Sequence, residues 1–205
     1  LIWYHFVDDD TREYFLRASG SSELMPFASV AYPGEASVSV DGRFAAVSGI
    51  VQPCSVLWEC PMKIWVWRAD TGQVVPLATP PNRAAYKPQF VTHSDGATWL
   101  YYQTTAYDTS PLCDGNLNAC EHTIVRRRAE GGPETVVARR AFAFTAGRDG
   151  VTAYLSHDVP RCDSVLCGML RLHLVDIRGD RVVADPASSL RPRAFSPDGR
   201  WLLYR

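Results

Sequence analysis

Apolar and polar residues alternate in short runs along this chain, and Asp-Gly dipeptides separate the runs at regular intervals. Alternation with a period of two places successive side chains on opposite faces of a β-strand. Asp-Gly is a strong turn signal between strands, because Gly adopts positive φ without steric cost. In matching contexts, 54, 54 and 49 residues apart, the dipeptide occurs at Asp41-Gly42, Asp95-Gly96, Asp149-Gly150 and Asp198-Gly199. The pattern predicts an all-β chain built from one repeated unit.

After each of the first three turns the chain follows the same order: an apolar second strand, an insertion with two cysteines, a third strand, a Gly-containing turn and a fourth strand. The third strands read KIWVWRAD, TIVRRRAE and LRLHLVDI, and the fourth strands read QVVPLAT, ETVVAR and RVVADP. At the N-terminus, LIWYHFV, EYFLRAS and ELMPFA fit a second, third and fourth strand. No apolar pattern with a period of 3.6 is sustained, so no helix is expected.

Repeats of about 50 residues with four strands each are typical of β-propeller blades. We therefore expect four-stranded antiparallel blades, divided into a partial blade, three whole blades and the first two strands of a further blade: 1–28, 29–79, 80–140, 141–190 and 191–205. These segments hold 17 strands, one more than four closed blades need. The chain is therefore expected to be a sector of a larger ring, or to be closed by remaining blades or another subunit.

The last repeat resembles the TolB-type β-propeller repeat, a relative of the WD repeat whose hallmark is a Ser-Pro-Asp-Gly turn after an aromatic residue. The stretch from Phe195 to Gly199 matches it fully. The other three copies keep Asp-Gly and replace the preceding pair by Ser39-Val40, His93-Ser94 and Gly147-Arg148. The resemblance implies a six- to eight-bladed ring. The resemblance predicts no particular activity, because such propellers occur in scaffolds, lectins, receptors and peptidase gating domains alike.

Six cysteines form three local pairs: Cys54 with Cys60, Cys113 with Cys120, and Cys162 with Cys167. An even number in separated pairs favours disulfides and an extracytoplasmic location, that is periplasmic, cell-surface or secreted. Zinc and free thiols remain alternatives, although no pair has the two-residue spacing of a zinc knuckle. Each pair lies in the loop between a second and a third strand, so the three loops are expected on one rim, opposite the Asp-Gly turns.

Oxygen ligands alternate between the second pair of cysteines, in the segment CDGNLNACE. Asp114, Asn116, Asn118 and Glu121 could begin a calcium loop. However, Ala119 stands where an EF-hand loop requires Gly, and the Glu comes too early. A polar hairpin tip is the alternative interpretation, so no cofactor is expected unless this segment binds calcium.

Composition excludes several function classes. The formal net charge is -1, with 46% hydrophobic and 21% charged residues, which gives no electrostatic footprint for nucleic acid. The longest apolar run, from Phe44 to Val51, is too short to cross a bilayer. The chain begins at Leu1 without a basic and apolar leader, so any secretory signal is expected to be removed or to lie outside this sequence.

Catalytic signatures are missing from the sequence, which holds neither Gly-x-Ser-x-Gly nor His-Glu-x-x-His. The five histidines fall in separate repeats, at His5, His93, His122, His157 and His173. His173 alternates with leucines and is interpreted as a strand-face residue. The basic clusters at Arg126–Arg128 and Arg139–Arg140 are expected to be solvent-exposed.

Three functions follow as hypotheses. The first is a non-enzymatic binding or scaffold module that presents the cysteine-closed loops to a protein or glycan partner. The second is a structural subunit that assembles through its open blade edges, since unpaired strands promote edge-to-edge association. The third is the gating propeller of a prolyl-peptidase-like hydrolase whose catalytic domain is absent.

Overall fold

The computed structural model describes residues 2–6, 11–17, 22–31, 34–50, 62–80, 83–106, 122–157, 170–185 and 191–204. Within these ranges the chain forms strands and a single 3₁₀ turn, η2 (Arg148–Gly150), and it has no α-helix. The strands are β1 (Ile2–Phe6), β2 (Thr11–Leu16), β3 (Met25–Ala31), β4 (Ala36–Val38), β5 (Phe44–Gly49), β6 (Lys63–Arg68), β7 (Val74–Pro76), β8 (Arg83–Thr92), β9 (Thr98–Ala106), β10 (His122–Arg128), β11 (Thr135–Arg139), β12 (Ala141–Ala146), β13 (Thr152–His157), β14 (Leu170–Asp176), β15 (Gly179–Ala184), β16 (Pro192–Phe195) and β17 (Leu202–Tyr204).

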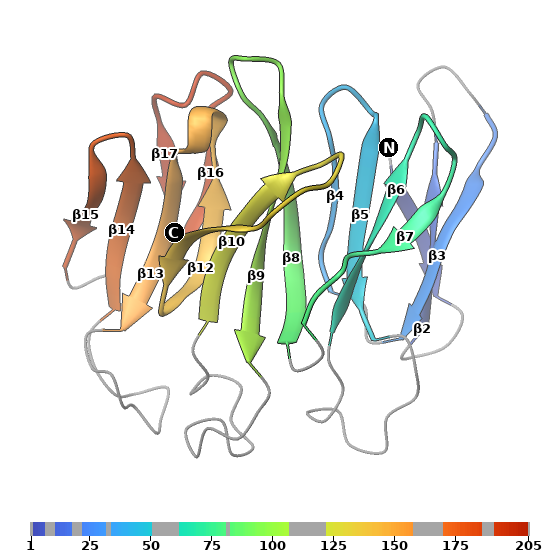
Figure 1. Cartoon of the computed structure of the whole chain (residues 1–205), viewed down its shortest axis with the longest axis horizontal. Helices are drawn as coiled ribbons and strands as arrows, with labels where there is room; N and C mark the ends of the chain where they lie inside the picture. The colour runs from blue at the N-terminus through green and yellow to red at the C-terminus, as the bar shows by residue number, and fades with distance from the viewer. Residues whose placement is uncertain are drawn as a thin grey trace.

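Each sheet is an antiparallel meander in which neighbours in sequence are neighbours in space. The described strands form three four-stranded sheets, β4–β7, β8–β11 and β12–β15. A three-stranded sheet, β1–β3, precedes them, and a two-stranded sheet, β16–β17, follows them. The sheets stand side by side in Figure 1. The prediction of an all-β chain with four-stranded antiparallel sheets is confirmed.

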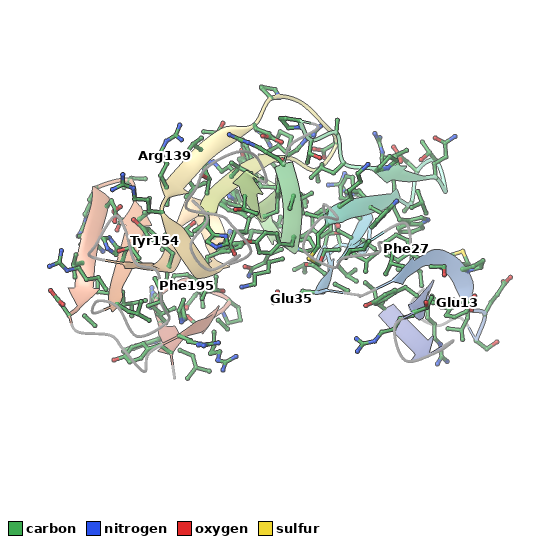
Figure 2. The ribbon with its side chains drawn as sticks, turned by 90° about the horizontal axis from the view of Figure 1, so that it is seen from below. Glu13, Phe27, Glu35, Arg139, Tyr154 and Phe195 are labelled. Atoms are coloured by element: carbon green, nitrogen blue, oxygen red, sulfur yellow. The ribbon has the colours of Figure 1, made fainter. Side chains whose placement is uncertain are left out.

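The five sheets follow one another along an open arc, seen from below in Figure 2. The first strands of neighbouring sheets contact each other, β4 with β8, β8 with β12, and β12 with β16. Glu35, just before β4, lies on the concave side of the arc, whereas Arg139, at the end of β11, lies on the convex side (Figure 2). First strands therefore line the inside of the arc and fourth strands its outside.

The core lies between the sheets, because each of the three four-stranded sheets is apolar on both faces. All six residues of β5 are buried. Phe44 and Ala46 pack toward the sheet β8–β11, whereas Ala45 and Val47 pack toward the sheet β1–β3. Successive side chains of one strand thus enter two different clusters, as the alternation of a strand requires. A sheet of this kind leaves apolar surface in water unless a neighbour covers each face.

Hydrogen bonds join the inner strands of adjacent sheets. The Gln89 side chain on β8 accepts a hydrogen bond from the backbone nitrogen of Ala146 at 2.9 Å and donates one to its carbonyl oxygen at 3.1 Å. The Ser37 hydroxyl accepts a hydrogen bond from the backbone nitrogen of Phe90 at 3.1 Å. Polar groups that would otherwise be buried without partners are satisfied across the sheet boundaries.

Most strand ends agree with the sequence pattern to within a few residues. The clearest exception is β3, which continues to Ala31, beyond the end of the expected strand ELMPFA. Its ladder with β2 explains the extension, since Ala31 pairs with Thr11 at the far end of that strand.

The contact between the last two sheets depends on a glycine. Gly147 has extended φ, and a Cβ placed on it would lie 2.8 Å from two ring carbons of Phe195. Gly147→Ala should therefore reduce the free energy of unfolding by about 1–3 kcal/mol, because the added methyl overpacks this contact. Urea denaturation measures the change.

The steric cause can be separated from a local backbone effect with a double-mutant cycle. Once Phe195→Ala has removed the ring, adding Gly147→Ala should cost markedly less than it does in the unmodified chain. An equal loss in both backgrounds would show that the ring is not the cause.

Candidate functional site

Three connections between second and third strands begin and end at one edge of the molecule. They are anchored by directly paired residues at the strand ends: Gly49 with Lys63, Thr105 with His122, and His157 with Leu170. The strands β5, β9 and β13 carry these anchors at their C-terminal ends, which lie along the lower edge in Figure 1, opposite the ends that follow the Asp-Gly turns. The sheets that carry them pack against one another, so the anchors form a fixed row.

The residues predicted from the sequence to act on this edge lie outside the described residues. These are the six cysteines and the four oxygen ligands, Cys54, Cys60, Cys113, Cys120, Cys162, Cys167, Asp114, Asn116, Asn118 and Glu121. They stay predictions. Within the described ranges, no three His, Cys, Asp or Glu side chains gather as they would around a metal ion.

The opposite edge carries the Asp-Gly turns, and three of their glycines have the same backbone geometry. Gly42, Gly96 and Gly199 have φ of +69°, +79° and +72°. Their backbone nitrogens donate hydrogen bonds to the carbonyl oxygens of residues 39, 93 and 196 at 2.9, 3.0 and 2.8 Å. Each glycine is therefore the fourth residue of its turn, in the left-handed region that other residues rarely adopt.

The structure confirms turns at these dipeptides and gives the position of each dipeptide within its turn. The Asp and Gly are not the two central residues. The central residues are Val40 and Asp41 in the first turn and Ser94 and Asp95 in the second. Gly42 and Gly96 follow these pairs and close the turns, after which the chain enters the second strand. A type I turn followed by a left-handed glycine gives the same strand reversal with one more residue.

Side chains close the first and last of these turns with one hydrogen-bond pattern. In the first turn, Ser39 Oγ donates to Asp41 Oδ1 at 2.6 Å and accepts from the backbone nitrogen of Phe44 at 2.9 Å. In the last turn, Ser196 Oγ donates to Asp198 at 2.6 Å and accepts from the nitrogen of Trp201 at 3.0 Å. The Ser at the first position thus closes both turns, although only the last has the complete Ser-Pro-Asp-Gly sequence.

Local ion pairs neutralise much of this turn-bearing edge. Asp41 pairs with Arg43 at 2.5 Å, and Asp70 pairs with Arg68 at 2.6 Å. Partial burial acts to raise the pKa of Asp41, but hydrogen bonds from Ser39 and Arg43 outweigh it, and the pKa falls below its ordinary value. With each carboxylate held by an adjacent arginine, these turns offer little uncompensated charge to a charged ligand.

The third Asp-Gly turn departs from this pattern and contacts the neighbouring sheet instead. Asp149 has φ 60° and directs Oδ1 to the backbone nitrogen of Ser94, 2.6 Å away. The hydrogen bonds from Ser94 hold the pKa of Asp149 below its ordinary value. Gly150 has φ +84°, and a Cβ there would lie 2.7 Å from Nη1 of Arg126. A side chain at this position would strain the left-handed backbone and displace the Arg126 guanidinium.

Arg126 lies beneath that turn, in a cluster centred on Trp99. The guanidinium carbons of Arg126 and Arg128 lie 5.0 and 4.5 Å from the Trp99 ring centroid, within the range of cation–π attraction. His93 stacks on the same indole with centroids 5.5 Å apart, and its Nε2 lies 3.2 Å from the Tyr101 hydroxyl. Burial, then Arg126, lowers the pKa of His93, so its ring is neutral at neutral pH.

The structure of this cluster corrects the expected exposure of the arginines and assigns contacts to His93. Arg126 and Arg127 are partly buried, so the prediction of a solvent-exposed arginine cluster is wrong for these two members. His93, for which the sequence suggests no role, contacts Trp99 and Tyr101. The signal available in the sequence was the spacing: residues two apart on a strand share a face, and Arg126 and Arg128 pair with Tyr101 and Trp99.

A Ser-His-Asp chain crosses the sheet β12–β15. Ser156 Oγ on β13 lies 2.8 Å from Nε2 of His173 on β14, and His173 Nδ1 lies 2.9 Å from Asp180 Oδ1 on β15. Tyr154 stacks on the His173 ring at 4.7 Å and donates its hydroxyl hydrogen bond to Asp180. Burial, then the bond to Asp180, raises the pKa of Tyr154.

The order of these contacts matches that of a serine hydrolase triad, but the surroundings differ. An acyl-transfer site needs free N–H groups aimed at the developing oxyanion. β13 is paired along both of its edges, with β12 and with β14, so its backbone N–H groups are used in the hydrogen bonds of the sheet. Tyr154, beside the chain, is 3% exposed and packs in the core between two sheets. The network is therefore assigned as a polar cross-link of three strands.

A cleft of about 810 Å³ separates the outer part of the sheet β12–β15 from the sheet β16–β17. Its apolar lining comes from β14, β15, β16 and β17, with Leu174, Val183, Phe195, Leu202 and Tyr204 among the residues. The sheet β16–β17 has no described strands opposite β14 and β15. The face of β14 and β15 that lines the cleft is therefore not covered by a described strand.

No protein-family model and no curated protein matches the chain. Solved structures do match it. Over 94% of the chain, TolB from Acinetobacter baumannii superposes with a TM-score of 0.57 at 10% identity, and the tricorn protease does so at 12% identity with the same score. The β-propeller domain of the Trilobed protease from Pyrococcus furiosus covers 91%, again at 0.57, with 13% identity. The fold is a TolB-like β-propeller.

The chain spans only part of these larger proteins: 22% of the tricorn protease chain, 42% of TolB and 53% of the Trilobed protease domain. At such low identities the likeness extends to the fold and not to any site. In the described part of the chain, no helix has the length and apolar character to cross a membrane.

Asp149 should make the free energy of unfolding depend on pH. Because its pKa is depressed in the folded propeller, its contribution to stability is present above the ordinary carboxyl pKa, near 4, and is lost as the pH falls through the lower folded value. Asp149→Asn should therefore flatten the fall in unfolding free energy between about pH 5 and pH 2. Urea midpoints measured across this range test the effect, and parallel curves for both proteins would contradict it.

The structural assignment of the Ser-His-Asp chain predicts two results. Ser156 should remain unmodified by a fluorophosphonate probe, as judged by peptide mass spectrometry. His173→Ala should reduce the free energy of unfolding by about 1–3 kcal/mol, because it leaves Ser156 and Asp180 without their shared partner. A covalent adduct on Ser156 that disappears in His173→Ala would contradict the assignment.

Proposed function

We propose that this propeller is a non-enzymatic binding or scaffold module that presents its three cysteine-containing connections to a protein or glycan partner. One observation carries the proposal: the three connections begin and end at paired residues on one edge of three consecutive, packed sheets. Loops held by a rigid scaffold are where proteins concentrate recognition. A row of three such loops gives a partner a continuous surface.

The packing between sheets supports pre-organisation of that surface. The anchors at Gly49, Thr105 and His157 end strands whose central residues are almost fully buried. The anchors therefore keep their spacing without a partner. Pairing of the cysteines within each connection would restrict the loops further and reduce the entropy lost on binding.

The same cysteines support an extracytoplasmic location for the module. Three local disulfides are typical of oxidising compartments and rare where thiols are kept reduced. Mass spectrometry of the unreduced protein after alkylation measures this part of the proposal. It expects no alkylated cysteine before reduction and six after it.

The binding role is tested by replacing the residues between the paired cysteines, 55–59, 114–119 and 163–166, with Gly-Ser sequences. The labelled protein and the triple replacement are applied to glycan and peptide arrays. Signals of the unmodified propeller should fall about tenfold or more in the replacement, because its contact surface has been removed. Its far-UV circular dichroism should stay unchanged.

A matched control replaces Ala69 and Asp70, in the turn between β6 and β7 on the opposite edge, with Gly-Ser. This control should keep full array binding. If the triple loop replacement binds as well as the unmodified protein, the proposal is wrong.

Assembly through an open edge is a second candidate, favoured by a separate observation. Trp201, Leu203 and Tyr204, on or beside β17, are 75%, 65% and 50% exposed. A short, apolar strand with one described neighbour is a template for pairing with another chain. This candidate concerns the end of the arc, whereas the first concerns the loop-bearing edge.

A further inference from the structure

The basic residues of the two edges differ in how they are paired. On the turn-bearing edge, six arginines form ion pairs with nearby aspartates: Arg43, Arg68, Arg128, Arg148, Arg181 and Arg200. On the loop-bearing edge, four basic residues form no ion pair with a described carboxylate: Lys63, Arg83, Arg139 and Arg140. We call these four residues the anchor cations.

Each anchor cation lies at a strand end that holds one of the long connections. Lys63 is itself an anchor of the first connection, paired with Gly49. Arg83 and Arg139 pair with the residues next to the two anchors of the second connection. Arg140 directly precedes β12, whose first residue pairs next to an anchor of the third. The strand pairing therefore fixes the backbone positions of all four.

Hydrogen bonds between the sheets bring the anchor cations into one patch. The backbone nitrogen of Ala85 on β8 donates to the carbonyl oxygen of Met62, just before β6, at 2.8 Å. Gln103 Nε2 on β9 donates to the carbonyl oxygen of Ala141, the first residue of β12, at 2.8 Å. The starts of β6, β8 and β12 are thus held together across the sheet boundaries. In Figure 2, which looks onto this edge, Arg139 marks the convex side of the patch.

The patch is accessible and has little described negative charge around it. Three anchor cations are exposed, and Arg83 is half-buried. On this edge of the three four-stranded sheets, the described carboxylates are those of Glu35 and Asp185, and Asp185 pairs with Arg171 at 3.0 Å. All of these sheets have a described neighbour on each side, so the patch does not depend on where the sequence begins or ends.

The three connections are acidic in sequence. Residues 51–61, 107–121 and 158–169 contain one basic residue, Arg161, and six acidic residues: Glu59, Asp108, Asp114, Glu121, Asp158 and Asp163. The loop-bearing edge therefore does not carry the large net positive charge that attracts every polyanion at long range. Its unpaired cations are suited to recognition by contact, in which a guanidinium donates two parallel hydrogen bonds to one carboxylate.

The same edge does not expose the side chains that a protein partner would bury. The exposed large apolar residues of the three four-stranded sheets lie in turns or in fourth strands: Val40, Val75, Val136, Ile177, Val182 and Val183. Among the described residues, none of them lies at a strand end that carries an anchor. Protein interfaces concentrate their binding energy in buried aromatic and apolar residues. Separate cations along an edge fit a linear, polar chain with repeated carboxylates better.

We propose that the loop-bearing edge binds an acidic polysaccharide, whose carboxylates pair with Lys63, Arg83, Arg139 and Arg140. This inference rests on the proposed function, because it names the class of partner for the same edge. Ion pairs at an exposed edge are screened by salt, so binding weakens as the ionic strength rises.

Alginate and hyaluronate serve as probes, because both are linear polymers whose charges are uronate carboxylates. Each is titrated against the immobilised 205-residue protein and followed by biolayer interferometry. Binding should be saturable and should weaken as sodium chloride is added. Propylene glycol alginate, in which ester groups replace most of the carboxylates, should not bind detectably.

The variant Lys63→Gln, Arg83→Gln, Arg139→Gln and Arg140→Gln should weaken binding about tenfold or more, because four exposed ion pairs are lost. A triple variant that keeps the half-buried Arg83 serves if circular dichroism shows that the quadruple variant is unfolded. The matched control carries four substitutions on the turn-bearing edge: Arg43→Gln, Arg68→Gln, Arg148→Gln and Arg181→Gln. It removes the same net charge and should bind like the unmodified protein.

Each outcome decides the proposal. Binding of either polyuronate that is lost in the quadruple variant and kept in the control supports it. Absence of binding to both polymers overturns it, as does undiminished binding by the quadruple variant, which is expected if these cations only compensate the acidic connections. Equal loss in variant and control would reflect net charge alone and overturn it. Tighter binding of poly-glutamate of equal charge would assign the edge to an acidic polypeptide and also overturn it.

Failure of this inference can be distinguished from failure of the proposed function. Array signals that require the connections but not the anchor cations would overturn the inference and leave the proposed function intact. Alginate binding that survives replacement of all three connections, and is lost in the quadruple variant, would overturn the proposed function and support the role of the anchor cations.

Discussion

The structure depends on one constraint: each of the three four-stranded sheets is apolar on both faces, so each needs a neighbour on both sides. In β5, Phe44 and Ala46 enter the core on one side while Ala45 and Val47 enter the core on the other. Such a sheet cannot be stable alone, since burial of apolar surface is the main favourable term in folding. Face-to-face stacking satisfies both faces and produces the arc of Figure 2.

Stacking also determines where the propeller can interact. Packing between the sheets covers their faces, so only the two edges and the ends of the arc are accessible to a partner. On one edge, Ser39 and Ser196 close their turns, and the turn carboxylates pair with adjacent arginines. The opposite edge carries the anchors of the three long connections. The proposed recognition surface is therefore placed on that edge.

The sequence was sufficient to predict the repeated unit, because its signals are local. Asp-Gly dipeptides and alternating runs specify strands within one sheet, and His173 was correctly placed on a strand. The dipeptide marks each turn without fixing which residues are central, because a left-handed glycine such as Gly42 or Gly96 is compatible with more than one turn type.

Contacts between sheets were not predictable in the same way. Asp149 meets Ser94, Gln89 meets Ala146 and Gly147 meets Phe195, each pair about one repeat apart. No local sequence pattern specifies which sheet faces will contact each other over such sequence separations. The Trp99 cluster was missed because its arginines had been interpreted as a charge run.

Hydrogen exchange along the arc of the free chain tests the packing constraint most directly. If stacking supplies the stability, protection should be greatest in β8 and β9, whose sheet has a complete four-stranded neighbour on each side, intermediate in β5 and β13, and least in β17. That gradient should persist at several denaturant concentrations. Equal protection in β17 and β9, or equal protection of every strand, would contradict the account, because the sheets would then be stable without their neighbours.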